Sequence, residues 1–387
     1  MLIFFVLFTW LVLGFLTLGI AGFHFVTMNR KAMKPWNFNI NGEYLPKISI
    51  IVPTFNEAQV IRLKLLNLSR LDYPNSLLHV IVVDSNSTDG TLEVVKGFSA
   101  QYPSLDLEVL SLSEKGKTAA LDFALNRAVG DIVVVSDADC FYERGMLKKA
   151  IPYLSVEDIG AISGVKMLLN ETSSGSVRAE QGYLNSMNRM KMGESKLGFT
   201  PLFEGGFSAY RIGEISSFDP YKTGSDDCGT IIKLAEDGKK AILVSEACFF
   251  TGFPTSRRER LRMKVRRSNQ LIRVFISYLS LLLHKRVKIG HRAICTNAYI
   301  YLFGPFLFVV FLVLTGVTFF FYPWLLLLLL LFTVPKVGTM LFELCQSYLV
   351  LFASLLAVAS GRKALIWSKP KDRELLTEEL LADAGLI

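Results

Sequence analysis

The chain of 387 residues lacks the glycine patterns of the commonest nucleotide sites. No Gly-x-Gly-x-x-Gly follows its first apolar strand pattern, and no Gly-x-x-x-x-Gly-Lys-Ser/Thr loop is present. The first absence argues against a dinucleotide cofactor, and the second argues against the phosphate loop of an ATPase. Any phosphate that binds here must therefore be neutralised by a metal ion or by cationic side chains.

Cysteine is also scarce, and its spacing is uninformative for a metal. The five cysteines are odd in number and lack the close spacing of a zinc site, which fits a domain in the reducing cytosol. They are Cys140, Cys228, Cys248, Cys295 and Cys345. No internal repeat of solenoid length is present, so a repeat array is excluded.

Long apolar runs are what the chain has in excess. It is 51% hydrophobic with a mean hydropathy of +0.39, which is too apolar for an ordinary soluble enzyme. Residues 2–27 are almost uninterrupted apolar sequence, long enough to cross about 30 Å of hydrocarbon. Basic residues follow this run at 30–34 instead of preceding it, which favours a spanning anchor at 1–28 over a cleaved signal peptide.

A second apolar block covers residues 296–361 and is interrupted by Pro305, Pro323 and Pro335. Two or three spans fit this length. The positive-inside rule places the basic residues at 30–34 and 362–373 in the cytoplasm, which requires an even number of crossings in the block. We therefore expect two spans, with residues 324–334 either extending a tilted helix or lying at the interface. The prediction is an integral protein of the cell membrane whose catalytic domain and tail (362–387) are cytosolic.

The formal net charge of +8 is concentrated just before this block, at 257–273. Nucleic acid is a conceivable partner for such a run. The stretch 261–283, however, also carries apolar residues at helical spacing and leads directly to the membrane block. We therefore interpret 256–290 as amphipathic helices on an anionic leaflet and expect no nucleic-acid partner.

The segment 46–255 alternates between strand and helix patterns. Strands are predicted over 48–52, 79–83, 107–110 and 131–135, and helices over 57–68, 91–101 and 117–129. A repeated β-α unit predicts an α/β domain of the doubly wound, Rossmann-like kind. Its sheet should be largely parallel with right-handed crossovers.

Polar clusters follow three of these strands, at 53–57, 84–90 and 137–139. Because a doubly wound sheet binds ligands beyond the carboxyl ends of its strands, we expect the three clusters to line one crevice. Asp137 and Asp139 are one residue apart, so their carboxylates point the same way and favour a divalent cation. A pair of solvated turn aspartates is the alternative for this tripeptide alone.

Four motifs in this order resemble the inverting family 2 glycosyltransferases with the GT-A fold. They are the segments 48–57, 83–91, 115–121 and 137–139, within a resemblance that covers about residues 47–270. The similar group includes the cellulose, chitin and hyaluronan synthases and ceramide glucosyltransferase. The resemblance implies a nucleotide-sugar donor, without separating UDP-sugars from GDP-sugars.

The resemblance also implies roles for the donor site. Pro53, Thr54 and Glu57 would line the nucleoside pocket, Asp84 would hydrogen-bond the base, and Lys117 would lie near the nucleotide. Asp137, Ala138 and Asp139 would bind the donor. Asp139, with Asp137, would hold Mg²⁺ or Mn²⁺ on the diphosphate, where a cation neutralises the charge of the leaving group.

On the acceptor side, Gly205 and Gly206 match the family's glycine loop, where missing side chains let a substrate approach the backbone. Asp226 and Asp227 match the Thr/Ser-Glu-Asp motif, with Asp226 in place of the usual Glu. The resemblance makes Asp227 the general base that deprotonates the acceptor hydroxyl. The two aspartates could also serve as N-caps for a helix predicted over 229–237.

The chain departs from the processive polysaccharide synthases near the membrane. Those enzymes carry Gln-x-x-Arg-Trp, and this chain has Met263, Arg266 and Arg267 at the corresponding places. Arg266 keeps the arginine that lies near the diphosphate. A sugar platform needs an aromatic face, so the loss of Trp argues against a long glycan at this point.

The predicted function is metal-dependent, inverting sugar transfer to a lipid or lipid-linked acceptor, without processive extension. A processive synthase that extrudes its polymer through the C-terminal block is one alternative. A polyprenyl-phosphate sugar synthase is another. A non-catalytic membrane scaffold or transporter is the alternative from outside transfer chemistry, and the intact set of aspartates speaks against it.

Overall fold

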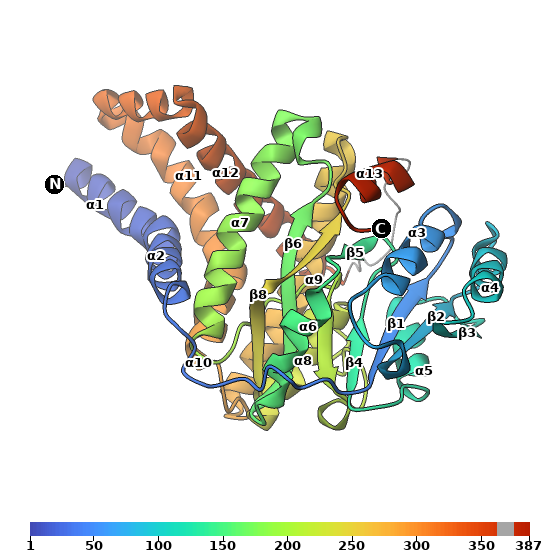
Figure 1. Cartoon of the computed structure of the whole chain (residues 1–387). Helices are drawn as coiled ribbons and strands as arrows, with labels where there is room; N and C mark the ends of the chain where they lie inside the picture. The colour runs from blue at the N-terminus through green and yellow to red at the C-terminus, as the bar shows by residue number, and fades with distance from the viewer. Residues whose placement is uncertain (362–374) are drawn as a thin grey trace.

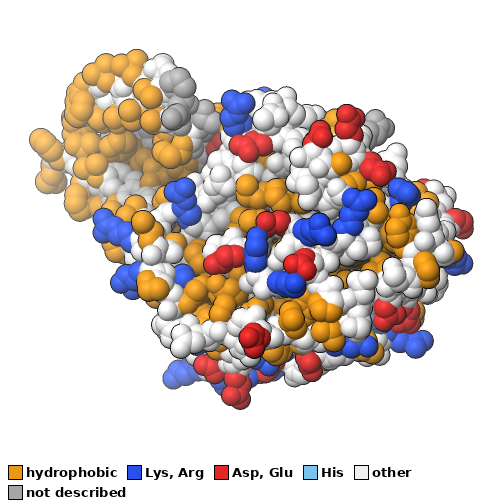
Figure 2. Space-filling model, viewed as in Figure 1, with side chains coloured by type: hydrophobic (Ala, Val, Ile, Leu, Met, Phe, Trp, Pro, Cys, Tyr) orange, Lys and Arg blue, Asp and Glu red, His pale blue; other side chains and the backbone are white. Residues whose placement is uncertain are grey.

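The computed structural model describes residues 1–361 and 375–387, and Figure 1 shows a sheet domain from which apolar helices project. The eight-stranded sheet has the order β3-β2-β1-β4-β7-β6-β8-β5. In the space-filling view of Figure 2, hydrophobic side chains gather on the projecting helices, whereas the domain carries mixed charge. The predicted α/β architecture with additional apolar helices is confirmed.

The first half of the sheet is the part that the sequence patterns predict. Its strands are β3 (Asp106–Ser111), β2 (Leu78–Asp84), β1 (Ile48–Thr54) and β4 (Ile132–Val135). All three pairings among them are parallel. Every residue of β1, β2 and β4 is buried, because helices cover both faces of this half.

The second half of the sheet is mixed. Its strands are β7 (Ser208–Arg211), β6 (Ile159–Leu168), β8 (Lys240–Thr251) and β5 (Cys140–Tyr142). β7 is antiparallel to both β4 and β6, and β5 is antiparallel to β8, while β6 and β8 are parallel. The expectation of a largely parallel sheet therefore holds for the first four strands only.

The three predicted crossover helices are present as α3 (Ala58–Ser69), α4 (Thr91–Gln101) and α5 (Lys117–Leu125). The prediction that α5 extends to residue 129 is wrong. The chain must turn before β4, and it does so at Gly130, whose φ is +92° and where a Cβ would lie 2.4 Å from the Lys47 carbonyl oxygen. Only glycine fits this left-handed turn next to Lys47. The chain must leave the helix before it reaches the turn, and α5 ends at Leu125.

The remaining helices of the domain are α6 (Met146–Ala150), α7 (Gly175–Ser195), α8 (Asp226–Asp237), α9 (Arg257–Leu283) and α10 (His291–Ala298). Short 3₁₀ turns lie at Asn75–Leu77, Ile151–Ser155, Glu171–Ser173 and Ile212–Glu214. α8 begins at Asp226 instead of the predicted residue 229, and Ser225 is its N-cap residue. Asp226 and Asp227 thus lie inside the first turn, where the helix dipole favours negative charge.

Among the residues that the structure describes, three helices are long and apolar enough to cross a membrane: Ile3–Ala32, His291–Phe321 and Met340–Ala359. The first comprises α1 (Leu2–Gly14), a π-helical turn (Phe15–Gly19) and α2 (Ile20–Ala32). The C-terminal block consists of a π-helical turn (Tyr299–Phe303), α11 (Gly304–Phe321), η7 (Pro323–Thr333) and α12 (Pro335–Ala359). η7 is an 11-residue 3₁₀ helix between the two long ones.

The C-terminal segment returns to the sheet domain. α13 (Glu378–Asp383) packs there, with Leu381 and Leu386 in the core of the domain. Asn67 Nδ2 of α3 donates a hydrogen bond of 2.8 Å to the Leu386 carbonyl. If α11 and α12 both cross the membrane, they bring the chain back to the side of the domain. The basic residues Arg362, Lys363, Lys369, Lys371 and Arg373 lie outside the described residues.

The N-terminal helix packs against α7 by close contact and through a buried polar cluster. At the helix crossing, a Cβ on Gly193 would lie 2.0 Å from the Met28 carbonyl oxygen. One turn away, His24 Nε2 contacts Glu194 Oε1 at 2.9 Å, and both side chains are buried. Asn297 Nδ2 donates to the same oxygen at 2.6 Å, and Thr200 Oγ1 donates to Oε2 at 2.7 Å.

Candidate active site

The ends of β1 and β2 bring the predicted nucleoside residues together. In the register of this pair, Pro53 lies opposite Val83 and Thr54 opposite Asp84. Thr54 Oγ1 donates to Asp84 Oδ1 at 3.2 Å, and the Ser87 amide donates to Asp84 Oδ2 at 2.9 Å. These bonds hold the Asp84 carboxylate at the strand end.

Glu57 connects the same corner to the next loop. Its amide donates to Thr91 Oγ1 at 2.7 Å, and its side chain is only 1% exposed. Before it, Asn56 has a φ of +54°, and its Oδ1 accepts from the Thr88 amide at 2.7 Å. The loops after β1 and β2 are therefore fixed against each other by side chain to backbone hydrogen bonds.

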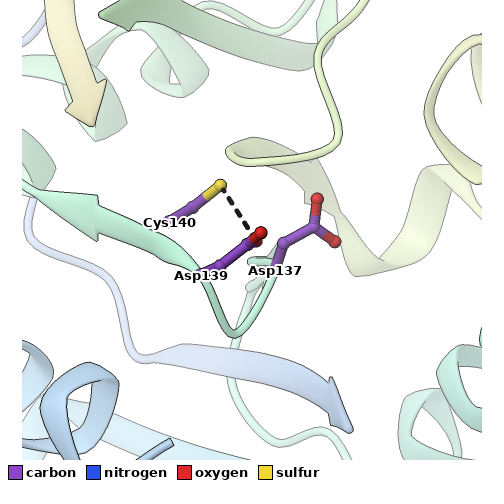
Figure 3. A group of neighbouring side chains, drawn as sticks. All are labelled: Asp137, Asp139 and Cys140. Carbon is purple, nitrogen blue, oxygen red and sulfur yellow. Dashed lines mark hydrogen bonds between the residues drawn. The ribbon is translucent and has the colours of Figure 1, made fainter. Parts of the chain in front are cut away.

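Asp137 and Asp139 follow β4 directly, as the sequence predicts. Their carboxylate oxygens and Cys140 Sγ lie within 4.8 Å of one another, a grouping that could hold a metal ion (Figure 3). Burial and then the two neighbouring carboxylates raise the pKa of the Cys140 thiol well above its usual value. The Ala138 side chain packs in the apolar core.

A buried lysine supports this loop from behind. Lys64 of α3 donates from Nζ to the Cys140 carbonyl at 2.6 Å and lies 3.9 Å from the centre of the Tyr142 ring. Burial lowers its pKa to about 7. Lys64 thus fixes the backbone that carries the two aspartates.

Lys117, the first residue of α5, joins the donor-side and acceptor-side aspartates. Its Nζ lies 2.7 Å from Asp137 Oδ1 and 2.8 Å from Asp226 Oδ2. Burial alone would lower the pKa of Lys117, but the two carboxylates outweigh burial and raise it well above its usual value. The side chain is therefore a fixed positive charge at the centre of the cluster.

The two aspartates at the start of α8 lie in different environments. Burial raises the pKa of Asp226 to about 6, against the lowering effect of Lys117 and with the help of the neighbouring Asp227. Asp227 accepts hydrogen bonds at Oδ1 from the Ser225 hydroxyl and from the Cys228 amide. Its other oxygen, Oδ2, faces Gly205, where a Cβ would lie 3.5 Å away.

The two glycines of the acceptor-side loop have different reasons to be glycine. At Gly205 a Cβ would approach Lys117 Nζ to 3.2 Å and Asp137 Oδ2 to 3.5 Å, so the absent side chain leaves space among the charged groups. At Gly206 a Cβ would lie 2.2 Å from the Phe249 ring, which leaves no room for it. Gly205 therefore opens the site, and Gly206 packs the loop.

Cations from two further elements approach the carboxylates. Arg266 of α9 has a buried Nε without a hydrogen-bond partner among the described residues. Burial and the adjacent Arg267 lower its pKa, whereas Asp137 and Asp226 act in the opposite direction. Arg266 thus interacts electrostatically with Asp137 and Asp226.

Sequence reasoning missed Lys166 of β6. It is 7% exposed, and its pKa is lowered by burial and by Arg267, while Glu204, Cys140 and Asp139 oppose this. The sequence does contain an indication of a buried lysine, because Lys166 is the only charged residue in the strand Ile159–Leu168. A lone lysine in an apolar strand pattern is unlike a surface residue.

Glu204, next to the glycine loop, was also missed. Its carboxylate pairs with Lys191 of α7 at 2.5 Å. Although burial alone would raise the pKa of Glu204, nearby cations, Lys191 first, lower it to about 2. This ion pair connects α7 to the loop that holds Gly205.

Known proteins similar to this chain include glycosyltransferases, which agrees with the arrangement of carboxylates and glycines described above. Residues 49–213 match the family model of Glycosyl transferase family 2. The matched segment includes β1, the Asp137 to Asp139 loop and both loop glycines. Residues 49–213 are therefore similar to a family 2 glycosyltransferase domain. This confirms the predicted enzyme class, a glycosyltransferase.

Three relatives illustrate the likeness. A probable glycosyltransferase of Bacillus subtilis, YdaM, is 34% identical over 154 residues, which are 38% of this chain and 35% of that protein. A β-monoglucosyldiacylglycerol synthase of Synechocystis is 35% identical over 127 residues, 33% of this chain and 26% of that one. The glycosyltransferase AglE of Haloferax volcanii is 31% identical over 120 residues, 31% and 39% of the two chains. The chain thus spans about a quarter to two-fifths of these proteins.

A solved structure covers far more of the chain. The mannosyltransferase PcManGT from Pyrobaculum calidifontis, in complex with GDP-Man and Mn²⁺, superimposes with a TM-score of 0.77 at 26% sequence identity. The likeness covers 90% of this chain and 97% of that one. The GT-A fold of this family is therefore confirmed for the sheet domain.

Proposed function

We propose that the chain transfers a sugar, with inversion, from a nucleotide-diphosphate donor to a lipid or lipid-linked acceptor at the membrane surface. The observation that supports this most is the meeting of carboxylates from two separate segments around Lys117, opposite Gly205. Donor-side and acceptor-side groups lie within a few ångströms there. Transfer between two bound substrates needs this proximity.

The donor would lie across the strand ends. Thr54 and Asp84, with Pro53 and Glu57 beside them, would bind the nucleoside. Arg266 would meet the diphosphate, because its buried Nε has no acceptor among the described residues and a phosphate oxygen supplies one. A UDP- or GDP-sugar fits this account equally.

The residues present fit a divalent ion, Mg²⁺ or Mn²⁺. Both are hard cations that take carboxylate oxygens, and Asp137 and Asp139 offer them. Both ions prefer oxygen ligands to thiolate sulfur, so Cys140 is not assigned as a ligand. When bound, such an ion supplies Lewis-acid stabilisation of the leaving diphosphate. The Mn²⁺ in the related mannosyltransferase structure supports the same assignment.

Asp227 would take the proton of the acceptor hydroxyl. Both hydrogen bonds that it accepts end on Oδ1, so Oδ2 faces the glycine loop where the acceptor would enter. Asp226 is held by Lys117 and would instead position that lysine. In-line attack by the deprotonated hydroxyl opposite the diphosphate inverts the anomeric carbon.

A lipid acceptor is supported by where α9 leads. This helix carries Arg266 beside the cluster and continues towards the apolar helices α11 and α12. The Synechocystis relative is a β-monoglucosyldiacylglycerol synthase by name. Arg267 in place of an aromatic platform favours single transfer. We place the chain among membrane-integrated members of the family, with its catalytic domain in the cytosol.

A donor panel tests this function. The purified full chain, membrane lipid extract and a set of UDP- and GDP-sugars would be incubated with Mn²⁺, and products read by mass. We expect one added sugar per lipid, abolished by chelation and restored by Mn²⁺. A ladder of products would favour a processive synthase, and release of the sugar by mild acid would favour a polyprenyl-phosphate product. No transfer from any donor would contradict the proposal.

A further inference from the structure

A second site lies away from the carboxylates, in a cavity of about 680 Å³ between α2 and α7. One face of α2 lines it, because Phe25, Asn29 and Met33 recur at helical spacing. α7 and the strands β6 and β8 complete the wall. None of its lining residues belongs to the cluster around Lys117.

The charged residues in this wall are two arginines, Arg30 of α2 and Arg189 of α7. No acidic residue lines the cavity, and no ion pair of the described chain includes either arginine. Two cations from separate helices thus border one cavity without a counter-charge. Such an arrangement attracts an anion.

Asn188 gives an independent indication of a ligand. It lines the same cavity and is 7% exposed, and its Nδ2 has no hydrogen-bond acceptor among the described residues. A buried amide donor without an acceptor is costly, and the oxygens of an anion would satisfy it. Asn188 and the two arginines line the same cavity.

The rest of the wall is apolar except for Asn29 and Ser245, and its place in the chain indicates a lipid. Phe25 and Val26 lie near the end of the candidate span Ile3–Ala32, just before the basic residues. A spanning helix passes from hydrocarbon to headgroups at such a point. In Figure 2, Lys and Arg side chains stand along the border between the apolar helices and the domain.

We propose that this cavity binds an anionic phospholipid. Its phosphate would lie against Arg30 and Arg189, with the Asn188 amide as a further donor. Its glycerol and first chain carbons would lie against the apolar side chains of α2 and α7. A free phosphate compound would leave this apolar surface uncovered, so the chemistry favours a lipid.

Photo-crosslinking of the full chain tests the proposal. The protein would be placed in nanodiscs of phosphatidylcholine with a small fraction of photoreactive phosphatidylglycerol, and adducts mapped by peptide mass. We expect adducts within residues 25–33 or 188–192. Excess unlabelled phosphatidylglycerol should remove them, and glycerol 3-phosphate should not.

Matched double variants separate a built site from general attraction. Arg30→Gln with Arg189→Gln should lower the adduct yield about tenfold, from the loss of two cations at the lipid surface. Lys31→Gln with Arg178→Gln removes the same charge from the same two helices, outside the lining, and should keep the yield. Asn188→Leu, which keeps both arginines, should lower the yield less.

Three outcomes would overturn the proposal. They are adducts that map elsewhere, equal loss in the two double variants, and displacement by glycerol 3-phosphate. If the arginine variant does not fold, as judged by size exclusion, Asn188→Leu decides: an unchanged yield in a folded protein counts against the site. The readout is a lipid adduct and not sugar transfer, so it is independent of the proposed function.

Discussion

Two polar clusters in this molecule differ in how their carboxylates are satisfied. At the junction of the anchor with α7, both oxygens of the single carboxylate, Glu194, are bound by neighbours. In the candidate active site, Asp137, Asp226 and Asp227 surround one lysine, with Asp139 close by. The first cluster thus has one carboxylate with both oxygens bound, and the second brings several carboxylates together near Lys117, Lys166 and Arg266.

This difference indicates which cluster holds structure and which awaits a ligand. A satisfied buried carboxylate stabilises the fold that it connects, and removing one partner is costly. Carboxylates that lie close together repel one another. Burial raises the pKa of Asp226, and repulsion from Asp227 and Asp137 raises it further. A bound cation would relieve that repulsion. We therefore interpret the carboxylate cluster as a binding site and the Glu194 cluster as a structural contact.

The largest expected effect is the loss of sugar transfer when Asp227 in the active-site cluster is changed. Asp227→Asn should lower the transfer rate about 10² to 10⁴-fold, because the acceptor hydroxyl loses its base. The melting temperature should hardly change. Asp237→Asn, at the exposed end of the same helix, is the matched control. Transfer by Asp227→Asn at the wild-type rate would remove the proposed base.

The next effect is on stability, at the junction. Glu194→Leu leaves His24 and its neighbours without their acceptor and should cost about 3–5 kcal/mol in the free energy of unfolding. Asp237→Asn, which breaks the exposed pair with Lys233, should cost less than about 1 kcal/mol. Denaturant unfolding in detergent would measure both. Equal costs would contradict the distinction between the clusters.

A smaller effect tests the helix crossing next to Glu194. Gly193→Ala adds a Cβ 2.0 Å from the Met28 carbonyl oxygen, so α2 must move away, at about 1–3 kcal/mol. Gly182→Ala, in the same helix with nothing within 4 Å, should be neutral or slightly stabilising. Thermal unfolding of the two variants compares them directly. A stabilised Gly193→Ala protein would show that the helices do not meet there.

A pH-dependent effect concerns the lysine behind the aspartate loop. Burial lowers the pKa of Lys64 to about 7, while in the unfolded chain it titrates near 10.5. Between these values the unfolded state holds more protons, so stability should rise with pH, by at most about 1.4 kcal/mol per pH unit. Lys64→Met should lose this part of the slope. Parallel curves for the two proteins between pH 7 and 10 would contradict the assignment.

The first half of the sheet was predictable because its signals are local. Buried strands such as β1 and β2 read as continuous apolar runs, and each is followed by a helix pattern and a polar cluster. Asp137 follows β4, and Lys117 begins α5, the helix that leads into β4. In the second half, β7 has only four residues and β5 only three, and the longer strands β6 and β8 were not predicted either. Such short strands form through tertiary pairing.

Partners that are far apart in sequence escaped prediction as well. His24 lies in an apolar run, and nothing local indicates that Glu194, 170 residues later, is its partner. The end of α5 was missed because the close approach of Gly130 to Lys47 is a tertiary contact. Lys166 was the one omission that the pattern itself could have corrected, as a charge inside an apolar strand.

The most direct test of the account is calorimetric binding of the donor by the full chain. GDP-mannose and UDP-glucose would be titrated with and without Mn²⁺, into the wild-type protein and into Asp139→Asn. We expect at least one donor to bind only with the ion, and to bind about tenfold or more weakly to the variant. Donor binding of equal strength without the ion and in the variant would contradict the claim that the acidic cluster holds a cation-bound diphosphate.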